Sequence, residues 1–145
     1  MSLKYINNIE YANEIEELYL NSFPKEERFP FWILEECSKE NNSDLYGIID
    51  NDKLIGGAIG FVEFNWYFLD LLYIDEEYRN RNIGTNLIKE IEKFALEEHL
   101  TGVRMETWNF QAKGFYEKNG YSVFGEIKDC PPGTIDYHLK KEFKQ

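Results

Sequence analysis

One short segment of the sequence, residues 72–85, carries residue types that can bind an anion. Arg79 and Arg81 lie just before Ile83, where the apolar periodicity predicts that a helix begins. The first turn of a helix presents backbone N–H groups without intrahelical acceptors, together with the positive end of the helix dipole. Two arginines at such a place, in a chain of net charge −11, predict a phosphate site. The spacing alone leaves a solvated turn as the alternative.

The segment matches neither of two common nucleotide-binding loops. No Gly-Lys-Ser/Thr follows it, so it is not a P-loop, and it lacks the G-x-G-x-x-G spacing of dinucleotide-binding folds.

Two motifs make a resemblance to a known family specific. Residues 79–85, RNRNIGT, resemble the acetyl-CoA signature Q/R-x-x-G-x-G/A of the GNAT superfamily of N-acetyltransferases, with Asn82 standing where glycine is usual. Asparagine tolerates left-handed dihedral angles better than other side chains, so the loop can keep its shape. Residues 109–121, NFQAKGFYEKNGY, resemble the family pattern N-x-x-A-x-x-F-Y-x-x-x-G-F/Y. Because motifs and elements follow the family order over nearly the whole chain, the protein is identified as a member.

The resemblance implies a binding site for acetyl-CoA, the co-substrate, and no metal ion. The backbone of Tyr73 and Ile74 should hydrogen-bond the pantetheine arm, and Asn109, Phe115 and Tyr116 should flank its far end. The pyrophosphate should be bound by the backbone N–H groups of the loop, which comprises Arg79, Asn80, Arg81, Asn82, Ile83, Gly84 and Thr85.

Acetyl transfer to an amine needs a base, an oxyanion donor and an acid. A lysine-like amine with a pKa of about 10.4 needs roughly 4.6 kcal/mol to lose its proton at pH 7. By resemblance, Tyr116 is the candidate acid for the thiolate, and a backbone donor near Ile74 serves the oxyanion. Asp70 is the candidate base, because it is the one charge in an otherwise apolar predicted strand. Glu63, Glu106 and an ordered water chain remain alternatives.

The periodicity predicts a mixed α/β (α+β) fold: one GNAT-type domain over residues 1–145, with a largely antiparallel central sheet flanked by about four helices. Helices are expected at residues 12–19, after Pro30, at 83–98 and at 110–119, the last with Asn109 as N-cap and Gly120 as C′ residue. Strands are expected at residues 45–49, 54–62, 66–74, 103–107, 121–124 and 135–139. The glycines of the second strand suggest a bulge or a close neighbour.

Composition limits the function classes. The net charge of −11 argues against general nucleic-acid binding and against docking on anionic membranes, and it is compatible with a cationic substrate. The two cysteines form no CxxC, no zinc-ligand spacing occurs, and no signal peptide is recognised, so a reduced, cytoplasmic protein is expected. The 11 Phe, 10 Tyr and 3 Trp indicate a packed core and leave both a monomer and a homodimer plausible.

The predicted function is therefore acetyl-CoA-dependent N-acetyl transfer to a primary amine, either on a small molecule or at a peptide N-terminus. A non-catalytic domain of the same fold that binds CoA or a protein partner is the alternative. The acceptor is not readable from the sequence.

Overall fold

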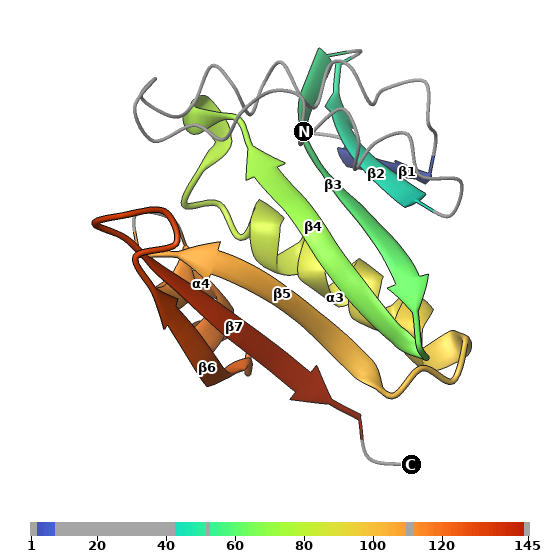
Figure 1. The fold of residues 1–145 in the computed structure, drawn as a ribbon. Helices are drawn as coiled ribbons and strands as arrows, with labels where there is room; N and C mark the ends of the chain where they lie inside the picture. The colour runs from blue at the N-terminus through green and yellow to red at the C-terminus, as the bar shows by residue number, and fades with distance from the viewer. Residues whose placement is uncertain (1–2, 8–42, 52, 110–111, 144–145) are drawn as a thin grey trace. The chain divides into compact units, whose positions relative to one another are not determined.

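The computed structural model describes residues 3–7, 43–51, 53–109 and 112–143, as strands, helices and the turns between them (Figure 1). The two helices predicted before residue 42 lie outside these residues. The chain divides into two compact units, one of residues 1–61 with 70–87, the other of residues 62–69 with 88–145. Strand β4 (Trp66–Ile74) and helix α3 (Ile83–Glu97) each contribute residues to both units.

The first unit is built on antiparallel strands in the order β1-β2-β3-β4. Strands β2 (Ser43–Asp50) and β3 (Lys53–Glu63) form the predicted hairpin, and β1 (Leu3–Asn7) pairs with β2 from Leu3↔Asp50 to Asn7↔Tyr46. The sequence analysis did not predict β1. Its five residues are too few for a distinct alternation of apolar and polar side chains.

The glycine-rich β3 contains both features that its composition predicts. The pairing of β2 with β3 shifts register between Ile48 and Ile49, where Ile55 is the extra residue of a bulge. At the next residue, Gly56, a Cβ atom would lie 2.6 Å from the backbone oxygen of Tyr73. A side chain there would force β3 and β4 apart, so glycine is required for their close approach.

The second unit has strand order β4-β5-β7-β6, with β5 at Gly102–Trp108, β6 at Ser122–Lys128 and β7 at Ile135–Glu142. Strand β5 pairs parallel with β4 from Trp66↔Gly102 to Leu69↔Met105 and antiparallel with β7, which pairs antiparallel with β6. The mixed, largely antiparallel sheet is therefore confirmed.

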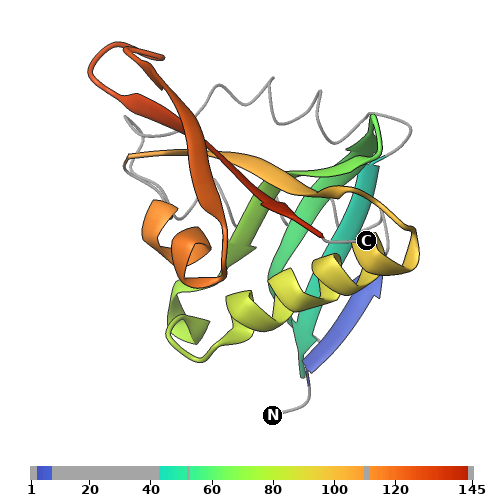
Figure 2. The same ribbon diagram turned by 90° about the horizontal axis from the view of Figure 1, so that it is seen from below.

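Helix α3 matches its prediction to within one residue at its end. Its apolar stripe is buried, with Ile83, Leu87, Ile88, Ile91 and Ala95 each at most 2% exposed. In the second unit the ring of Phe94 packs edge-on against Tyr67 of β4, with 6.1 Å between ring centroids. Figure 2 shows α3 and α4 (Lys113–Lys118) on one side of the strands of this unit. The opposite face of β5 therefore presents Arg104, Glu106 and Trp108.

The described residues contain two α-helices, α3 and α4, and the short 3₁₀ helix η3 (Glu76–Tyr78). The fold class is therefore confirmed, whereas the predicted number of about four helices is not. No helix in this described part is long and apolar enough to cross a membrane.

One buried carboxylate joins three elements of the second unit. Glu92 of α3 accepts hydrogen bonds from the Tyr121 hydroxyl at 2.9 Å and from Lys141 Nζ at 3.1 and 3.2 Å. Lys141 Nζ also donates to the Asn119 carbonyl at the end of α4. These bonds connect α3, the turn after α4 and strand β7.

Candidate active site

The loop that follows β4 in the first unit is closed by its own hydrogen bonds. Asp75 caps η3, because its Oδ1 atom accepts from the Glu77 N–H at 3.0 Å and its carbonyl accepts from the Tyr78 N–H at 2.8 Å. Acidic side chains at an N-cap position satisfy the first N–H groups of a helix. The chain therefore leaves β4 through a defined turn. This turn fixes the position of the backbone that carries Arg79 and Arg81.

Arg79 is held against the end of β4. Its Nε donates to the carbonyl oxygen of Ile74 at 3.0 Å, and its guanidinium lies 5.5 Å from the ring centroid of Tyr73. Arg81 stacks over Tyr78 at 5.3 Å. Both arginines are exposed residues. A guanidinium has five N–H donors, so one bond to Ile74 orients Arg79 and leaves it able to bind an anion.

The two asparagines of the loop adopt left-handed backbone angles. The φ angle is 64° at Asn80 and 61° at Asn82, the second in the position where the family pattern has glycine. The shape expected for Asn82 is therefore confirmed. The first helical bond of α3 runs from Asn86 N–H to the Asn82 carbonyl. The N–H groups of Ile83, Gly84 and Thr85 thus have no intrahelical acceptor and can face an anion.

Tyr78 ties this loop to the end of β2. Its hydroxyl donates to Asp50 Oδ2 at 3.0 Å, and this hydrogen bond raises the pKa of Tyr78 above its usual value. Asp50 is only 5% exposed. Nothing local to residue 50 in the sequence indicates a partner 28 residues away.

The backbone N–H and carbonyl groups of Ile74 point to the edge of β4 opposite β3. The N–H of Asp75 donates to the Ile55 carbonyl of β3 at 2.6 Å. Because successive residues of a strand direct their backbone groups to opposite edges, the N–H and the carbonyl of Ile74 point the other way. The carbonyl is bound by Arg79.

In the second unit, Tyr116 is buried in α4 at 7% exposure. Its ring contacts those of Phe115 and Tyr121, with centroids 5.3 and 6.1 Å away. Burial raises the pKa of the Tyr116 hydroxyl far above its usual value. The hydroxyl therefore keeps its proton at neutral pH, as a proton donor must.

Asn109 does not cap a helix, so this prediction was wrong. Its Oδ1 accepts from the Ile135 N–H and its own N–H donates to the Ile135 carbonyl, both at 3.0 Å. Helix α4 begins instead at Lys113, after Ala112, whose N–H donates to Thr107 Oγ1 at 3.2 Å. The tertiary partner on β7 outcompetes the local cap. Gly120 has the positive φ angle expected of a C′ residue, 92°.

The three candidate bases lie in different surroundings. Asp70 is half-buried on β4 rather than fully buried, Glu63 is exposed at the end of β3, and Glu106 is half-buried on β5. Of these, Glu106 belongs to a group that the sequence analysis missed.

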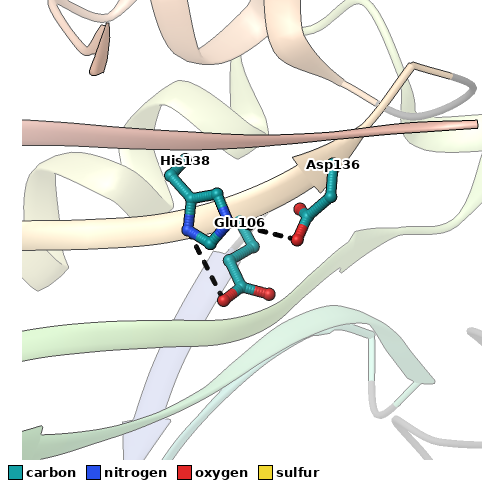
Figure 3. Close-up of side chains that lie close together, drawn as sticks. All are labelled: Glu106, Asp136 and His138. Atoms are coloured by element: carbon teal, nitrogen blue, oxygen red, sulfur yellow. Dashed lines mark ion pairs between the residues drawn. The ribbon is translucent and has the colours of Figure 1, made fainter. Parts of the chain in front are cut away.

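Glu106, His138 and Asp136 lie together on one face of β5 and β7, and we call them the β5–β7 cluster (Figure 3). His138 is the register partner of Glu106, with Nδ1 3.6 Å from Glu106 Oε1, and its Nε2 is 3.2 Å from Asp136 Oδ2. Burial and, second to it, the Glu106 charge raise the pKa of Asp136 to about 6, against the opposing effect of His138. Alternation of Asp136 and His138 along β7 was visible in the sequence, but the register with β5 was not.

Comparisons with known proteins show the family of this chain. The sequence model of the acetyltransferase (GNAT) family matches residues 12–121. Blasticidin-S acetyltransferase of Streptomyces morookaense is 40% identical over 98 residues, which cover 67% of this chain and 72% of that protein. Spermidine N(1)-acetyltransferase of Thermoplasma acidophilum is 32% identical over 129 residues, covering 79% and 80%.

A solved structure extends the likeness to the fold. The PaiA N-acetyltransferase of Thermoplasma acidophilum, in complex with coenzyme A, superposes with a TM-score of 0.73 at 20% identity and covers 99% of this chain and 100% of that one. The residues matched by the family model include the loop with Arg79 and Arg81, strand β5 and helix α4. The chain therefore belongs to the acetyltransferase (GNAT) family.

Proposed function

We infer that this protein is an N-acetyltransferase that moves the acetyl group of acetyl-CoA directly to a primary amine. The observation that carries the inference is the loop after β4, where two left-handed asparagines lead into the first turn of α3 and Arg79 is held on the Ile74 carbonyl. Free N–H groups and a positioned guanidinium at a helix start suit a pyrophosphate.

The proposal assigns roles to the loop and to the ends of the strands. The N–H groups of residues 79–85 bind the pyrophosphate, and the backbone of Tyr73 and Ile74 lies along the pantetheine arm. Asn109, Phe115 and Tyr116 flank the far end of that arm. Asn109 contacts the arm through its exposed surface, because its Oδ1 and its backbone N–H are already hydrogen-bonded to Ile135.

The Ile74 N–H is proposed as the oxyanion donor, since it faces the edge of β4 away from β3. Backbone N–H groups stabilise the charge that develops on the thioester oxygen during attack by the amine. Tyr116 is proposed to give its proton to the leaving thiolate. Its position in the motif supports that role, and its hydroxyl is protonated at neutral pH, while burial also makes that proton harder to release. Asp70 is the first candidate for the base, with Glu63 and Glu106 as alternatives.

The acceptor class is an amine that carries positive charge. The net charge of −11 favours cationic acceptors through the overall field. The related proteins named for blasticidin S and spermidine support the same class. The proposal includes a cytoplasmic location, supported by the free thiol of Cys130, and a monomer or homodimer without nucleic-acid or membrane partners.

The test combines binding with turnover. We expect calorimetry to detect acetyl-CoA binding and a thiol assay to detect CoA release with spermidine, blasticidin S or a lysine peptide as acceptor. Gly84→Val should abolish binding, because a β-branched side chain blocks the approach of phosphates to the first turn of α3. Asn86→Ala, two residues further along α3, is the control. Binding without turnover on any amine would favour the non-catalytic alternative, and normal binding by Gly84→Val would refute the assigned loop.

A further inference from the structure

The β5–β7 cluster becomes more buried from Glu106 to Asp136. The side chain of Glu106 is 34% exposed, that of His138 is 24% exposed and that of Asp136 only 5%. Asp136 Oδ1 and His138 Nε2 both lack a hydrogen-bond partner in the described structure. A buried carboxylate is costly without compensation, so the position of Asp136 behind the imidazole calls for a chemical reason. Glu106, at the open end, is the member that a ligand can reach.

The two contacts of His138 indicate how many protons the cluster can hold. Each ring nitrogen faces a carboxylate oxygen, Nδ1 toward Glu106 and Nε2 toward Asp136. Each contact is attractive only when a proton lies between its two atoms, and a neutral imidazole supplies only one. Without a second proton, one nitrogen lone pair faces carboxylate lone pairs. The cluster therefore has a place for one further proton.

A metal ion does not fit this arrangement as it stands. The donor atoms of the three residues lie within 4.8 Å of one another, which is close enough to consider an ion. The two carboxylates, however, lie against opposite nitrogens of one imidazole ring, and a metal ion binds a histidine through a single nitrogen. A proton between Glu106 and His138 needs only a small approach of the two side chains, because Nδ1 and Oε1 lie 3.6 Å apart and a hydrogen bond is shorter than that.

Glu106 lies at a gap in the strand pairing of the second unit. The register of β5 with β4 ends at Leu69↔Met105, one residue before Glu106, whereas β5 remains paired with β7 through Trp108. Val103 pairs with Tyr67, whose ring contacts Phe94 of α3, so Glu106 projects from the opposite face of β5.

We propose that Glu106 accepts the proton of the acceptor's ammonium group, and that His138 and Asp136 are positioning residues that hold this proton in the cluster. The proposal rests on the acetyl transfer proposed above and replaces Asp70 by Glu106 as the base.

The step balances with the groups named. The ammonium group R–NH₃⁺ gives one proton to the Glu106 carboxylate, where the proton then lies against His138 Nδ1 and removes the repulsion between the two lone pairs. The neutral amine attacks the thioester carbon, the new C–N bond forms, and the C–S bond breaks. The nitrogen gives its second proton to a water molecule, the thiolate takes the proton of the Tyr116 hydroxyl, and that water returns a proton to Tyr116. Release of the first proton from Glu106 to water resets the cluster.

Charged and aromatic side chains of the neighbouring strands surround the cluster. Arg104 of β5 and Lys140 of β7 are register partners on the same face, one pair along from Glu106 and His138. Arg104 lies over the Phe68 ring of β4, and Lys140 pairs with Glu142. From β6 the ring of Phe124 packs against His138, with 6.1 Å between ring centroids.

The first test compares carboxylates under saturating acetyl-CoA with spermidine as acceptor. Glu106→Gln should lower kcat by about 10²-fold or more with acetyl-CoA affinity unchanged. Glu126→Gln, an exposed carboxylate on β6, is the matched control and should retain wild-type kcat. If Glu106→Gln retains wild-type kcat, or if only Asp70→Asn shows the loss, the proposal is overturned.

The second test measures kcat/KM against pH, which a merely structural role would not move. Wild-type kcat/KM should fall as the pH is lowered, because a cluster that already holds its second proton cannot take another. Asp136→Asn removes one negative charge, so this fall should move to lower pH, and His138→Gln should flatten it. Unchanged profiles in both variants would overturn the roles of His138 and Asp136. A wild-type protein that binds acetyl-CoA but acetylates no amine would instead refute the proposed function itself.

Discussion

The Nε atom of Arg79 donates to the carbonyl oxygen of Ile74 at 3.0 Å, so the loop that starts α3 is folded back onto the end of β4. Through this bond, the arginine proposed for the pyrophosphate and the backbone proposed for the pantetheine arm hold each other in place. Changes to Arg79 are therefore expected to affect both parts of acetyl-CoA binding.

Replacement of Arg79 and Arg81 together by alanine should weaken acetyl-CoA binding about 10- to 100-fold, because charge-assisted hydrogen bonds contribute roughly 1.5–3 kcal/mol. The loss should be larger at low ionic strength, where charges are less screened. Calorimetric titration at two salt concentrations measures this effect, with Lys89→Ala on the exposed side of α3 as a control. Equal affinity of the double variant and the wild type at low salt would mean that backbone groups alone bind the phosphates.

Asn82→Gly should leave both acetyl-CoA binding and thermal stability close to wild type, whereas Asn82→Val should reduce both. The φ angle of 61° is accessible to glycine and strained for a β-branched residue, at a cost of roughly 1–2 kcal/mol. Melting temperatures with and without acetyl-CoA separate the two effects. A valine variant as stable as the glycine variant would contradict the left-handed geometry.

Tyr116→Phe should lower kcat about 10²- to 10⁴-fold with little change in acetyl-CoA affinity, because the ring keeps its packing on Phe115 and Tyr121 while the proton donor is lost. Steady-state rates and melting temperature are measured on the same preparation. A tyrosine that serves only the core would show the reverse pattern, with lower stability and an unchanged rate per folded molecule.

Asp136 should make stability depend on pH between about 4 and 6. Its pKa in the folded protein is raised from 3.8 to about 6 by burial and by Glu106, so the folded state binds the proton more tightly than the unfolded state. The stabilising effect of that proton is present below pH 4 and is lost as the pH rises through 6. Urea unfolding at several pH values should show this loss in the wild type, and a smaller one in Asp136→Asn. Parallel curves for the two proteins would argue against the raised pKa.

The elements that the sequence predicted well are those whose signal is local. Helix α3 repeats apolar residues at helical spacing over fifteen residues, and five residues of that stripe are at most 2% exposed, so period and burial agree. Asn82 was predicted to take a left-handed conformation from residue type and motif position, and it does.

The features that the sequence did not predict depend on partners distant in the chain. Asn109 has the right residue type for an N-cap, yet its bonds go to Ile135, 26 residues away. The β5–β7 cluster exists only because the register places His138 opposite Glu106. Asp70 was predicted as the base because it interrupts an apolar strand. Glu106 lacks that signal, because it lies between Met105 and Thr107 on a shorter strand.

The bonds made by Glu92 limit how the C-terminus can be altered. A chain shortened before Lys141 would leave the Glu92 carboxylate, 14% exposed, with the Tyr121 hydroxyl as its remaining described partner and no compensating cation. Such a truncation would also free the Asn119 carbonyl at the end of the helix that carries Tyr116. Affinity tags and fusion partners should therefore leave strand β7 with its Lys141 intact.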